Sequence, residues 1–163
     1  GLPMSLKWPN DVMVEGRKVA GIRAESQLSG SALETAVGGM GINFEWPSDD
    51  LPEEIVARAT SLSLATAAAD RPLPGRDEVL RSILQEFEML YGLIGDPEGE
   101  RMILERATQR SELIGRNIEV RYPDDRILYG VARGIRPSGQ LEVESDGETV
   151  VVDVAEVQRV RPQ

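Results

Sequence analysis

The chain has 163 residues, a net charge of −10, and neither histidine nor cysteine. These absences exclude disulfides, thiolate nucleophiles, imidazole bases and metal sites built on cysteine or histidine, so any chemistry must use lysine, arginine, carboxylates, amides, hydroxyls, backbone groups or an oxygen-bound ion such as Mg²⁺. A hydrophobic content of 40% supplies a core. The excess of acidic residues leads us to expect that the chain does not bind nucleic acid. With neither a long apolar run nor a leader, we expect a cytoplasmic protein that does not bind membranes.

The first part of the chain predicts short strands at hairpin spacing. We expect four of them, at residues 4–8, 12–15, 19–27 and 32–37, the last one resuming at 42–44 after a run of glycines. Turn residues separate the strands: Pro9-Asn10-Asp11, Gly16 and Ser29-Gly30-Ser31. This spacing predicts a sheet that is antiparallel here and antiparallel or mixed overall.

Helical patterns follow a break at Trp46–Asp50. We expect one helix from Ile55 to about Ala69, started by Pro52, and we interpret the acidic pairs around this start as helix N-terminal charges rather than catalytic carboxylates. Those pairs are Asp49-Asp50 and Glu53-Glu54.

The strongest helical pattern begins at Arg76 and ends near Gly92 and Gly95. Its apolar residues recur at intervals of three and four, which is typical of a helix face buried in a core. They are Val79, Leu80, Ile83, Leu84, Phe87, Leu90 and Tyr91. A further charged helix is expected over residues 98–110.

After Glu112 the pattern changes to strands with tight turns between them. The expected strands are 117–122, 127–133, 140–145, 148–154 and 157–160. Five short strands in this length indicate a small barrel, with Arg133 and Arg136 on its surface. We therefore predict two domains, residues 1–111 and residues 112–163.

Only two of the eighteen basic residues are lysines, Lys7 and Lys18. A lysine is a compact charge on a flexible stem and suits an anion whose geometry changes. Lys7 lies in an otherwise apolar strand, where a lysine requires an anionic partner, and the following turn is expected to bring it near Asp11. For Trp8 we expect a place in the core.

Two glycines and an amide end the fourth predicted strand, in Gly39-x-Gly41-x-Asn43. Glycines there allow a flat or phosphorylated ligand to approach the backbone, with Asn43 donating an amide hydrogen bond. This is not a dinucleotide fingerprint, because no helix start follows.

Three segments together resemble the biotin protein ligase family in order and in spacing. They are Lys7-Trp8-Pro9-Asn10-Asp11-Val12, Arg17-Lys18-Val19-Ala20-Gly21-Ile22-x-x-Glu25 and Val37-x-Gly39-x-Gly41-Ile42-Asn43. Leu113-Ile114-Gly115 and Gly130-x-Ala132-x-Gly134-Ile135-x-x-x-Gly139-x-Leu141 resemble the SH3-like domain of that family. The resemblance implies an α+β fold, in which a mixed sheet with packed helices, like a class II synthetase core, is followed by a small SH3-like barrel.

The resemblance also implies a two-step reaction. Biotin attacks ATP to give biotinyl-5′-AMP and pyrophosphate, with Mg²⁺ as the metal ion, and a lysine of a biotin carboxyl carrier protein then attacks the mixed anhydride. Fixed cations and Mg²⁺ offset the repulsion between two anionic substrates. Such chemistry requires neither histidine nor cysteine.

Carried onto matching positions, the resemblance makes Lys18 the contact for the biotin carboxyl group and the α-phosphate, with Lys7 as a second cation. Asn43 would contact the nucleotide or phosphate side, and Asp11 would orient a lysine or assist the metal, whose ligands are not assigned. The remaining implied ligand-binding residues are Asn10, Gly21, Gly39, Gly41 and Ile42.

One family feature has no match here: the Gly-Arg-Gly-Arg loop that precedes the Lys-Trp-Pro-Asn-Asp segment. We therefore expect the later half of a catalytic domain plus the barrel, a poor or inactive catalyst alone, and exposed sheet edges that favour self-association, with a possible homodimer through strands around 19–37. Two alternatives stay open. One is a non-catalytic module whose barrel docks a carrier protein or the parent catalytic domain, and the other is a lipoate-type ligase.

Overall fold

The structure, a computed structural model, describes residues 1–30, 32–46, 52–154, 157 and 159–162. It separates into two compact units, the first formed by Gly1–Ser5 and Asn10–Arg76 and the second by Leu6–Pro9 and Asp77–Gln163. Among the described residues, no helix combines the length and the apolar character that crossing a membrane requires.

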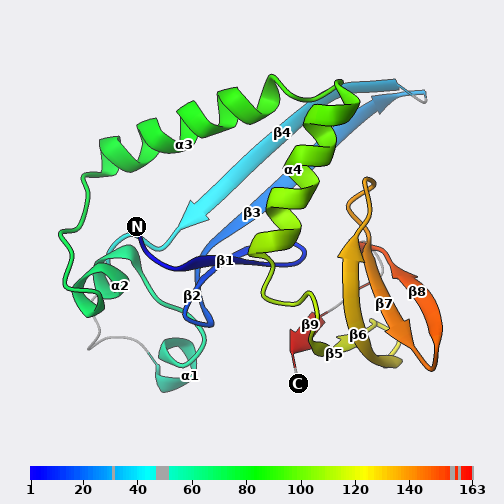
Figure 1. Ribbon diagram of the computed structural model, residues 1–163. Coiled ribbons are helices and arrows are strands. Elements are labelled where there is room, and N and C mark those ends of the chain that lie inside the picture. The colour runs from blue at the N-terminus through cyan, green and yellow to red at the C-terminus, as the bar shows by residue number, and fades with distance from the viewer. Residues whose placement is uncertain (31, 47–51, 155–156, 158, 163) are drawn as a thin grey trace. The chain divides into compact units, whose positions relative to one another are not determined.

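The first four strands form one sheet in the order β1-β2-β3-β4. Their bounds are β1 (Met4–Lys7), β2 (Asp11–Val14), β3 (Arg17–Ser29) and β4 (Ala32–Ile42). β3 and β4 are the two long neighbouring strands in Figure 1 and pair antiparallel. Glu15 and Gly16 both have positive φ, 49° and 74°, which is the signature of the tight turn whose twist matches a β-hairpin. The four predicted strands and the predicted turn at Gly16 are confirmed.

The single helix expected from Ile55 to about Ala69 is wrong. The structure has a short α1 (Glu53–Val56) and a separate α2 (Leu62–Ala68). The segment between them leaves the helical path to pair with β3, forming an isolated parallel bridge between Ala59 and Lys18. The Ser61 hydroxyl then accepts a hydrogen bond from the Leu64 amide at 3.2 Å and so starts α2.

The buried side chains of the first unit come from β2, β3, α2 and the two residues that precede α2. They are Met13, Val14, Val19, Ala20, Leu62 and Ala65, with the polar Thr60, Ser61 and Thr66. Thr66 is buried in a helix because its hydroxyl donates to the Leu62 carbonyl at 2.8 Å. This packing fixes the start of β3, next to Lys18, because Val19 and Ala20 are buried in it.

Two longer helices follow, α3 (Arg76–Tyr91) and α4 (Pro97–Arg110), as the sequence predicts. The interpretation of the α3 apolar stripe as core is wrong, because the helix has no buried residue. Leu80, Leu84, Phe87 and Tyr91 are each more than half exposed. Helical periodicity reports that one face of a helix is apolar, and it does not report whether anything covers that face.

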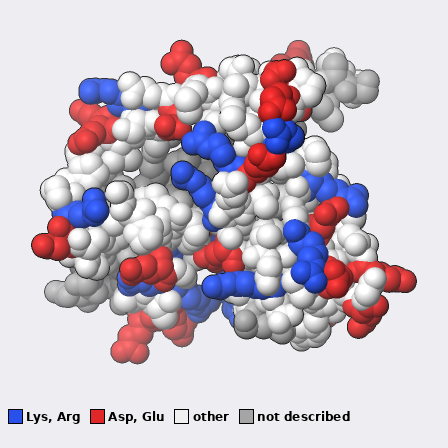
Figure 2. Space-filling view, viewed as in Figure 1, with Lys and Arg blue, Asp and Glu red and all other residues white. Residues whose placement is uncertain are grey.

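The last five strands form an antiparallel sheet in the order β8-β7-β6-β5-β9. Their bounds are β5 (Asn117–Arg121), β6 (Ile127–Ile135), β7 (Leu141–Ser145), β8 (Glu148–Val152) and β9 (Arg159–Pro162). The first four predicted strands are confirmed, and the fifth, expected at 157–160, overlaps β9 only at its last two residues. Their core contains fully buried Ile118, Val120, Ala132, Leu141 and Val143. Arg133 and Arg136 lie on the surface and pair with Glu144 and Glu142. Figure 2 shows that acidic and basic side chains are interspersed on the face it draws.

Trp8 belongs to this second core, where it is 6% exposed. Its indole N–H donates to the Gly139 carbonyl at 2.9 Å, so the predicted core role is confirmed although the core is that of the terminal strands. The segment Leu6–Pro9 is further tied to the end of α4 by a parallel bridge between Leu6 and Ser111. A tryptophan far away in the sequence therefore completes the packing of the C-terminal strands.

Several predictions fall wholly or partly outside the described residues. These are the loop position Ser31, most of the break at 46–50 with Asp49-Asp50, and part of the strand expected at 157–160. The boundary at Glu112 stays a prediction, since the two compact units group α4 and nearly all of α3 with the terminal strands.

Candidate functional site

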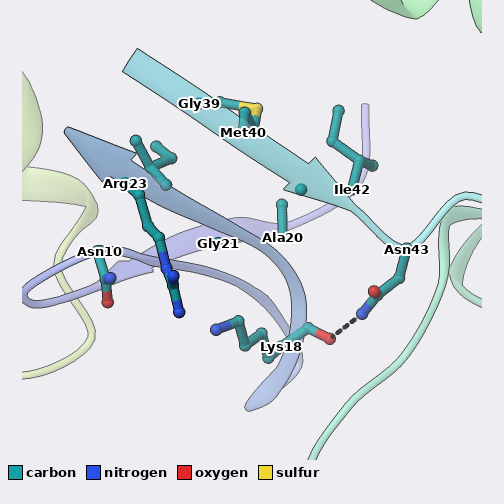
Figure 3. Close-up of a pocket in the computed structure, with 11 residues that line it drawn as sticks. Asn10, Lys18, Ala20, Gly21, Arg23, Gly39, Met40, Ile42 and Asn43 are labelled. Atoms are coloured by element: carbon teal, nitrogen blue, oxygen red, sulfur yellow. Dashed lines mark hydrogen bonds between the residues drawn. The ribbon is translucent and has the colours of Figure 1, made fainter. Parts of the chain in front are cut away.

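A hollow of about 650 Å³ lies on the first sheet, over the start of β3 and the end of β4. It is lined by Asn10, Lys18, Ala20, Gly21, Ile22, Arg23, Gly39, Met40, Gly41, Ile42 and Asn43. Figure 3 shows how these side chains lie around it. The lining joins two cations to several glycines, a combination that offers charge and close backbone approach to the same ligand.

A β-bulge aims Lys18 into this hollow. Val12 pairs with Ala20 and Met13 with Lys18, so Val19 is an extra residue on β3. In a regular strand, residues 18 and 21 would face opposite sides of the sheet. The extra residue instead brings the Lys18 side chain over Gly21, and its Nζ lies 2.9 Å from the position that a β-carbon on Gly21 would occupy.

Asp11 holds the Lys18 ammonium group in place. It is the cross-strand partner of Gly21, and its Oδ1 lies 2.5 Å from Lys18 Nζ. The Asp11 side chain is only 24% exposed and that of Lys18 is 44% exposed. The ammonium group is therefore anchored on one side and open to the hollow on the other.

The backbone of Lys18 is fixed by the segment between α1 and α2. The Lys18 amide donates to the Arg58 carbonyl at 2.9 Å, and the Thr60 amide donates to the Lys18 carbonyl at 2.8 Å. The Asn43 side-chain amide donates to the carbonyls of Thr60, at 3.1 Å, and Lys18, at 3.4 Å, the second drawn in Figure 3. Both the side chain and the backbone of Lys18 are thus held before any ligand binds.

The floor of the hollow is bare backbone. Gly21 pairs with Gly41 and Arg23 with Gly39 across the β3–β4 ladder. A β-carbon built on Gly39 or on Gly41 would meet nothing within 4 Å, so open space lies directly above both residues. Because no side chain stands in the way, a flat ligand is able to lie close to the strand backbone there.

The structure brings together most of the residues singled out from the sequence. Lys18, Asn43, Asn10, Gly21, Gly39, Gly41 and Ile42 line one hollow, and Asp11 contacts Lys18. Lys7 belongs to the other compact unit, so its place as a second cation stays a prediction. The ligand contacts of all these residues stay predictions as well, although the Asn43 amide hydrogens are directed at backbone carbonyls in this structure.

Sequence reasoning missed Arg23. Its side chain lines the hollow beside Lys18, and both extend to the same side of the sheet in Figure 3. The signal was present, since residues 21 and 23 of one strand share a face. It was hidden because the motif Gly21-Ile22-x-x-Glu25 leaves position 23 unspecified.

The described residues do not fit a protein-built Mg²⁺ site. No group of three or more acidic side chains with a metal-binding arrangement occurs among them. The Asp11 carboxylate, which lies beside this hollow, is already paired with the Lys18 ammonium group. We therefore assign no metal ligands and derive no step through a metal ion.

Two family models match the chain. Residues 1–43 match the biotin/lipoate A/B protein ligase family, and residues 113–160 match the biotin protein ligase C-terminal domain. These matches include the strands that carry the hollow and most of the terminal sheet.

Known proteins resemble the chain over nearly its whole length. The biotin–[acetyl-CoA-carboxylase] ligase of Mycobacterium tuberculosis is 34% identical over 156 residues, which is 96% of this chain and 53% of that protein. The bifunctional ligase/repressor BirA of Escherichia coli is 29% identical over 87% of this chain and 42% of its own length. The chain thus spans about half the length of these relatives.

A solved structure has the same fold. The biotin protein ligase from Aquifex aeolicus in complex with biotin and ATP matches 99% of this chain and 63% of its own, with a TM-score of 0.77 and 25% identity. Its fold confirms the predicted α+β class.

Proposed function

Because this chain belongs to the biotin protein ligase family, we propose that its glycine-floored hollow binds biotin and the nucleotide during the formation of biotinyl-5′-AMP. The observation that carries the proposal is the Lys18 ammonium group, held over Gly21 by Asp11 and open to the hollow. A related ligase has been solved with both biotin and ATP bound, which supports the choice of ligands.

In the first step, a carboxylate oxygen of biotin attacks the α-phosphorus of ATP, and pyrophosphate leaves. Two anions must meet, and the attacked phosphate gains charge in the transition state. A cation fixed at the point of contact offsets both effects, and it contributes most when it is already positioned. Lys18 fits this role because its stem and its backbone are both restrained.

The glycines supply the binding surface for the biotin part of the ligand. Gly39 and Gly41 leave open space above the strands, so an apolar ring is able to lie against the backbone there. Asn10 lines the same hollow and would contact the ligand at its side. Ile42 would contact it through its backbone, since its side chain points to the other side of the sheet in Figure 3. Asn43 would act on the nucleotide side, and Lys7 would add a second cation.

In the second step, the deprotonated amine of a lysine on a biotin carboxyl carrier protein attacks the acyl carbon of biotinyl-5′-AMP. An amide bond forms, the bond between the acyl carbon and the phosphate oxygen breaks, AMP leaves as the phosphate anion, and the proton lost by the amine passes to solvent. The same Lys18 cation would stabilise the charge on the departing phosphate. The carrier protein is thus proposed as the partner of the whole enzyme, with residues 1–111 as catalytic part and residues 112–163 as the SH3-like domain.

The test is calorimetric titration of the folded chain with biotinyl-5′-AMP. We expect micromolar affinity, weakened about 10- to 100-fold in Lys18→Ala, as is typical for loss of a charged hydrogen-bonding partner. The matched control is Arg71→Gln, which removes one positive charge from an exposed position of the same unit, outside the hollow. Equal affinity of the parent chain and Lys18→Ala would contradict the assignment of this site.

Lipoate is the competing substrate, since the model matching residues 1–43 covers biotin and lipoate ligases together. The match of residues 113–160 to the biotin protein ligase C-terminal domain favours biotin. In a competition titration we expect biotin to displace biotinyl-5′-AMP and lipoate not to do so. The reverse order would move the chain to the lipoate branch.

Two properties of the chain and one alternative function stay predictions, and each has a direct measurement. Slow or absent turnover by the chain alone is checked by pyrophosphate release in the presence of biotin and ATP. A homodimer through strands around 19–37 is checked by light scattering after size-exclusion chromatography. A barrel that binds only a carrier protein, with no affinity for biotinyl-5′-AMP, would favour the non-catalytic module instead.

A further inference from the structure

We propose that Arg23 and Lys18 together form a two-cation site for one oxyanionic group of the ligand, a carboxylate or a phosphate. This inference deepens the proposed function and rests on it for the identity of the ligand. It names a residue that the sequence motifs leave unspecified.

The first observation is the direction of the two side chains. Arg23 and Gly21 lie two residues apart on β3 and so share a face, and the bulge puts Lys18 Nζ over Gly21 on that same face. Figure 3 shows the Arg23 guanidinium and the Lys18 ammonium group extending into one region of the hollow, while Ala20 and Ile42 point to the other side. Two cations from one strand thus lie on one face of the sheet and line the same hollow.

The second observation is what surrounds Arg23. Its cross-strand partner is Gly39, which offers no side chain for the arginine stem to pack on. Open space lies above Gly39 and above Gly41 beside it. An arginine placed there faces a ligand-sized opening rather than a neighbouring side chain.

The third observation concerns charge. Lys18 is already paired with Asp11 at 2.5 Å, whereas Arg23 forms no ion pair with any acidic side chain that the structure describes. The hollow therefore keeps one uncompensated positive charge, and that charge belongs to Arg23. A protein with a net charge of −10 repels anions in general, so an uncompensated cation inside a hollow marks where an anion would be held.

The chemistry of the guanidinium group fits this use. It is planar, always charged, and donates two parallel hydrogen bonds to a carboxylate or a phosphate. Lys18 and Arg23 would then contact different oxygens of the same group. Arg23 would supply a positive charge for the ligand, because the charge of Lys18 is offset by Asp11.

The experiment compares the parent chain with Arg23→Gln in calorimetric titrations with four probes. Biotinyl-5′-AMP and AMP carry a phosphate, biotin carries a carboxylate, and biotinamide is uncharged and keeps the ring. We expect Arg23→Gln to weaken biotinyl-5′-AMP about tenfold or more and to leave biotinamide unchanged. Arg23→Lys should recover part of the lost affinity, because lysine keeps the positive charge but lacks the two parallel donors of a guanidinium group.

The probes also distinguish the two sources of the oxyanion. A loss shared by AMP and biotinyl-5′-AMP assigns Arg23 to the phosphate, and a loss confined to biotin assigns it to the carboxylate. Arg71→Gln is the control for net charge, and thermal unfolding checks that each variant is folded. Added salt should narrow the difference between the parent chain and Arg23→Gln, since screening weakens exposed charge interactions.

The outcomes separate this proposal from the proposed function. If no biotin compound binds while AMP binds in an Arg23-dependent way, biotin is the wrong ligand and the two-cation site stands. If Arg23→Gln binds every anionic probe as the parent chain does, or weakens biotinamide equally, the two-cation site is overturned. Absence of any anion binding by the folded parent chain, or an equal loss in Arg71→Gln, overturns it too.

Discussion

The terminal sheet and the β3–β4 hairpin use apolar residues in opposite ways. In the terminal sheet, Ile118, Leu141 and Val152 are fully buried. In the hairpin, Leu33 is 62% exposed and Val37 is 63% exposed. The same residue types therefore form a self-contained core in one region and an open surface in the other.

The difference follows from what each strand faces. The terminal strands curl into a small unit whose inward side chains meet one another, with Trp8 added from the start of the chain. The hairpin has glycines at positions 38, 39 and 41 on β4, and a strand without side chains has little to pack with. The hairpin sequence therefore favours an open binding surface over a core.

The largest effect is expected from one substitution made in both regions. Leu141→Ala should lower the free energy of unfolding by about 2–5 kcal/mol, because it removes a fully buried side chain and leaves a cavity. Leu33→Ala should cost less than about 0.5 kcal/mol, as for an exposed position. Urea unfolding followed by circular dichroism measures both.

The contrast fails if the two substitutions cost the same. A large cost at Leu33 would mean that the hairpin is covered in solution. Repeating the Leu33→Ala measurement over a range of protein concentrations would then identify self-association as the cover, since the cost would grow with concentration.

The contrast between the regions also explains which parts of the molecule were predictable. The strands β5 to β8 were found from alternation and turn residues because each pairs with the next strand along the chain. The break between α1 and α2 was missed because it depends on pairing between Ala59 and Lys18, which are far apart. Local patterns do not encode such a contact.

The candidate site divides in the same way. Lys18 and the glycines were found from residue type and spacing. The bulge at Val19, which aims Lys18 over Gly21, has no local signal in the sequence. Without knowledge of this bulge, the sequence does not predict that Lys18 and Arg23 share a face of the sheet.

A second prediction concerns the side-chain amide that fixes Lys18. Asn43→Asp keeps the shape of the residue but removes both hydrogen bonds to the carbonyls of Lys18 and Thr60. Unfolding should become easier by about 1–3 kcal/mol, the range for a buried carbonyl that loses a hydrogen-bond donor, here the carbonyl of Thr60. Amide exchange at Thr60 should quicken, since that amide donates to the same Lys18 carbonyl.

Asn117→Asp is the control for this substitution. Asn117 is exposed at the start of β5 in the other unit, so its replacement should leave exchange at Thr60 unchanged. Unaltered exchange in Asn43→Asp would show that Asn43 does not hold the Lys18 segment.

A third prediction uses a glycine of the hollow and rests on the proposed function. In Gly21→Ala, the new β-carbon would lie 2.9 Å from Lys18 Nζ and 3.0 Å from its Cε. Both atoms belong to the end of a flexible side chain, so the fold should tolerate the change while Lys18 moves away from Asp11. Affinity for biotinyl-5′-AMP should fall about tenfold, or about 1.4 kcal/mol.

Gly38→Ala is the matched control, because a β-carbon there would meet nothing within 4 Å and Gly38 does not line the hollow. Its affinity for biotinyl-5′-AMP should equal that of the parent chain. If both alanine variants bind alike, the position of Lys18 over Gly21 is irrelevant to ligand binding.

The smallest expected effect is electrostatic and belongs to the terminal sheet. A hydrogen bond from the Arg133 guanidinium, together with its charge, lowers the pKa of the Glu144 carboxyl below its ordinary 4.5, across a distance of 2.9 Å. Because the pKa is lower in the folded state, the pair stabilises the fold above that ordinary value, and the gain disappears as the pH falls through the folded pKa.

Both side chains are about half exposed, so the effect should be slight and should fade with added salt. Thermal unfolding between neutral pH and about pH 3 should therefore show a slightly shallower acid decline in Glu144→Gln than in the parent chain. Glu148→Gln, at an exposed glutamate of β8, should retain the decline of the parent chain, and a larger change there than in Glu144→Gln would remove the Arg133–Glu144 pair as the cause.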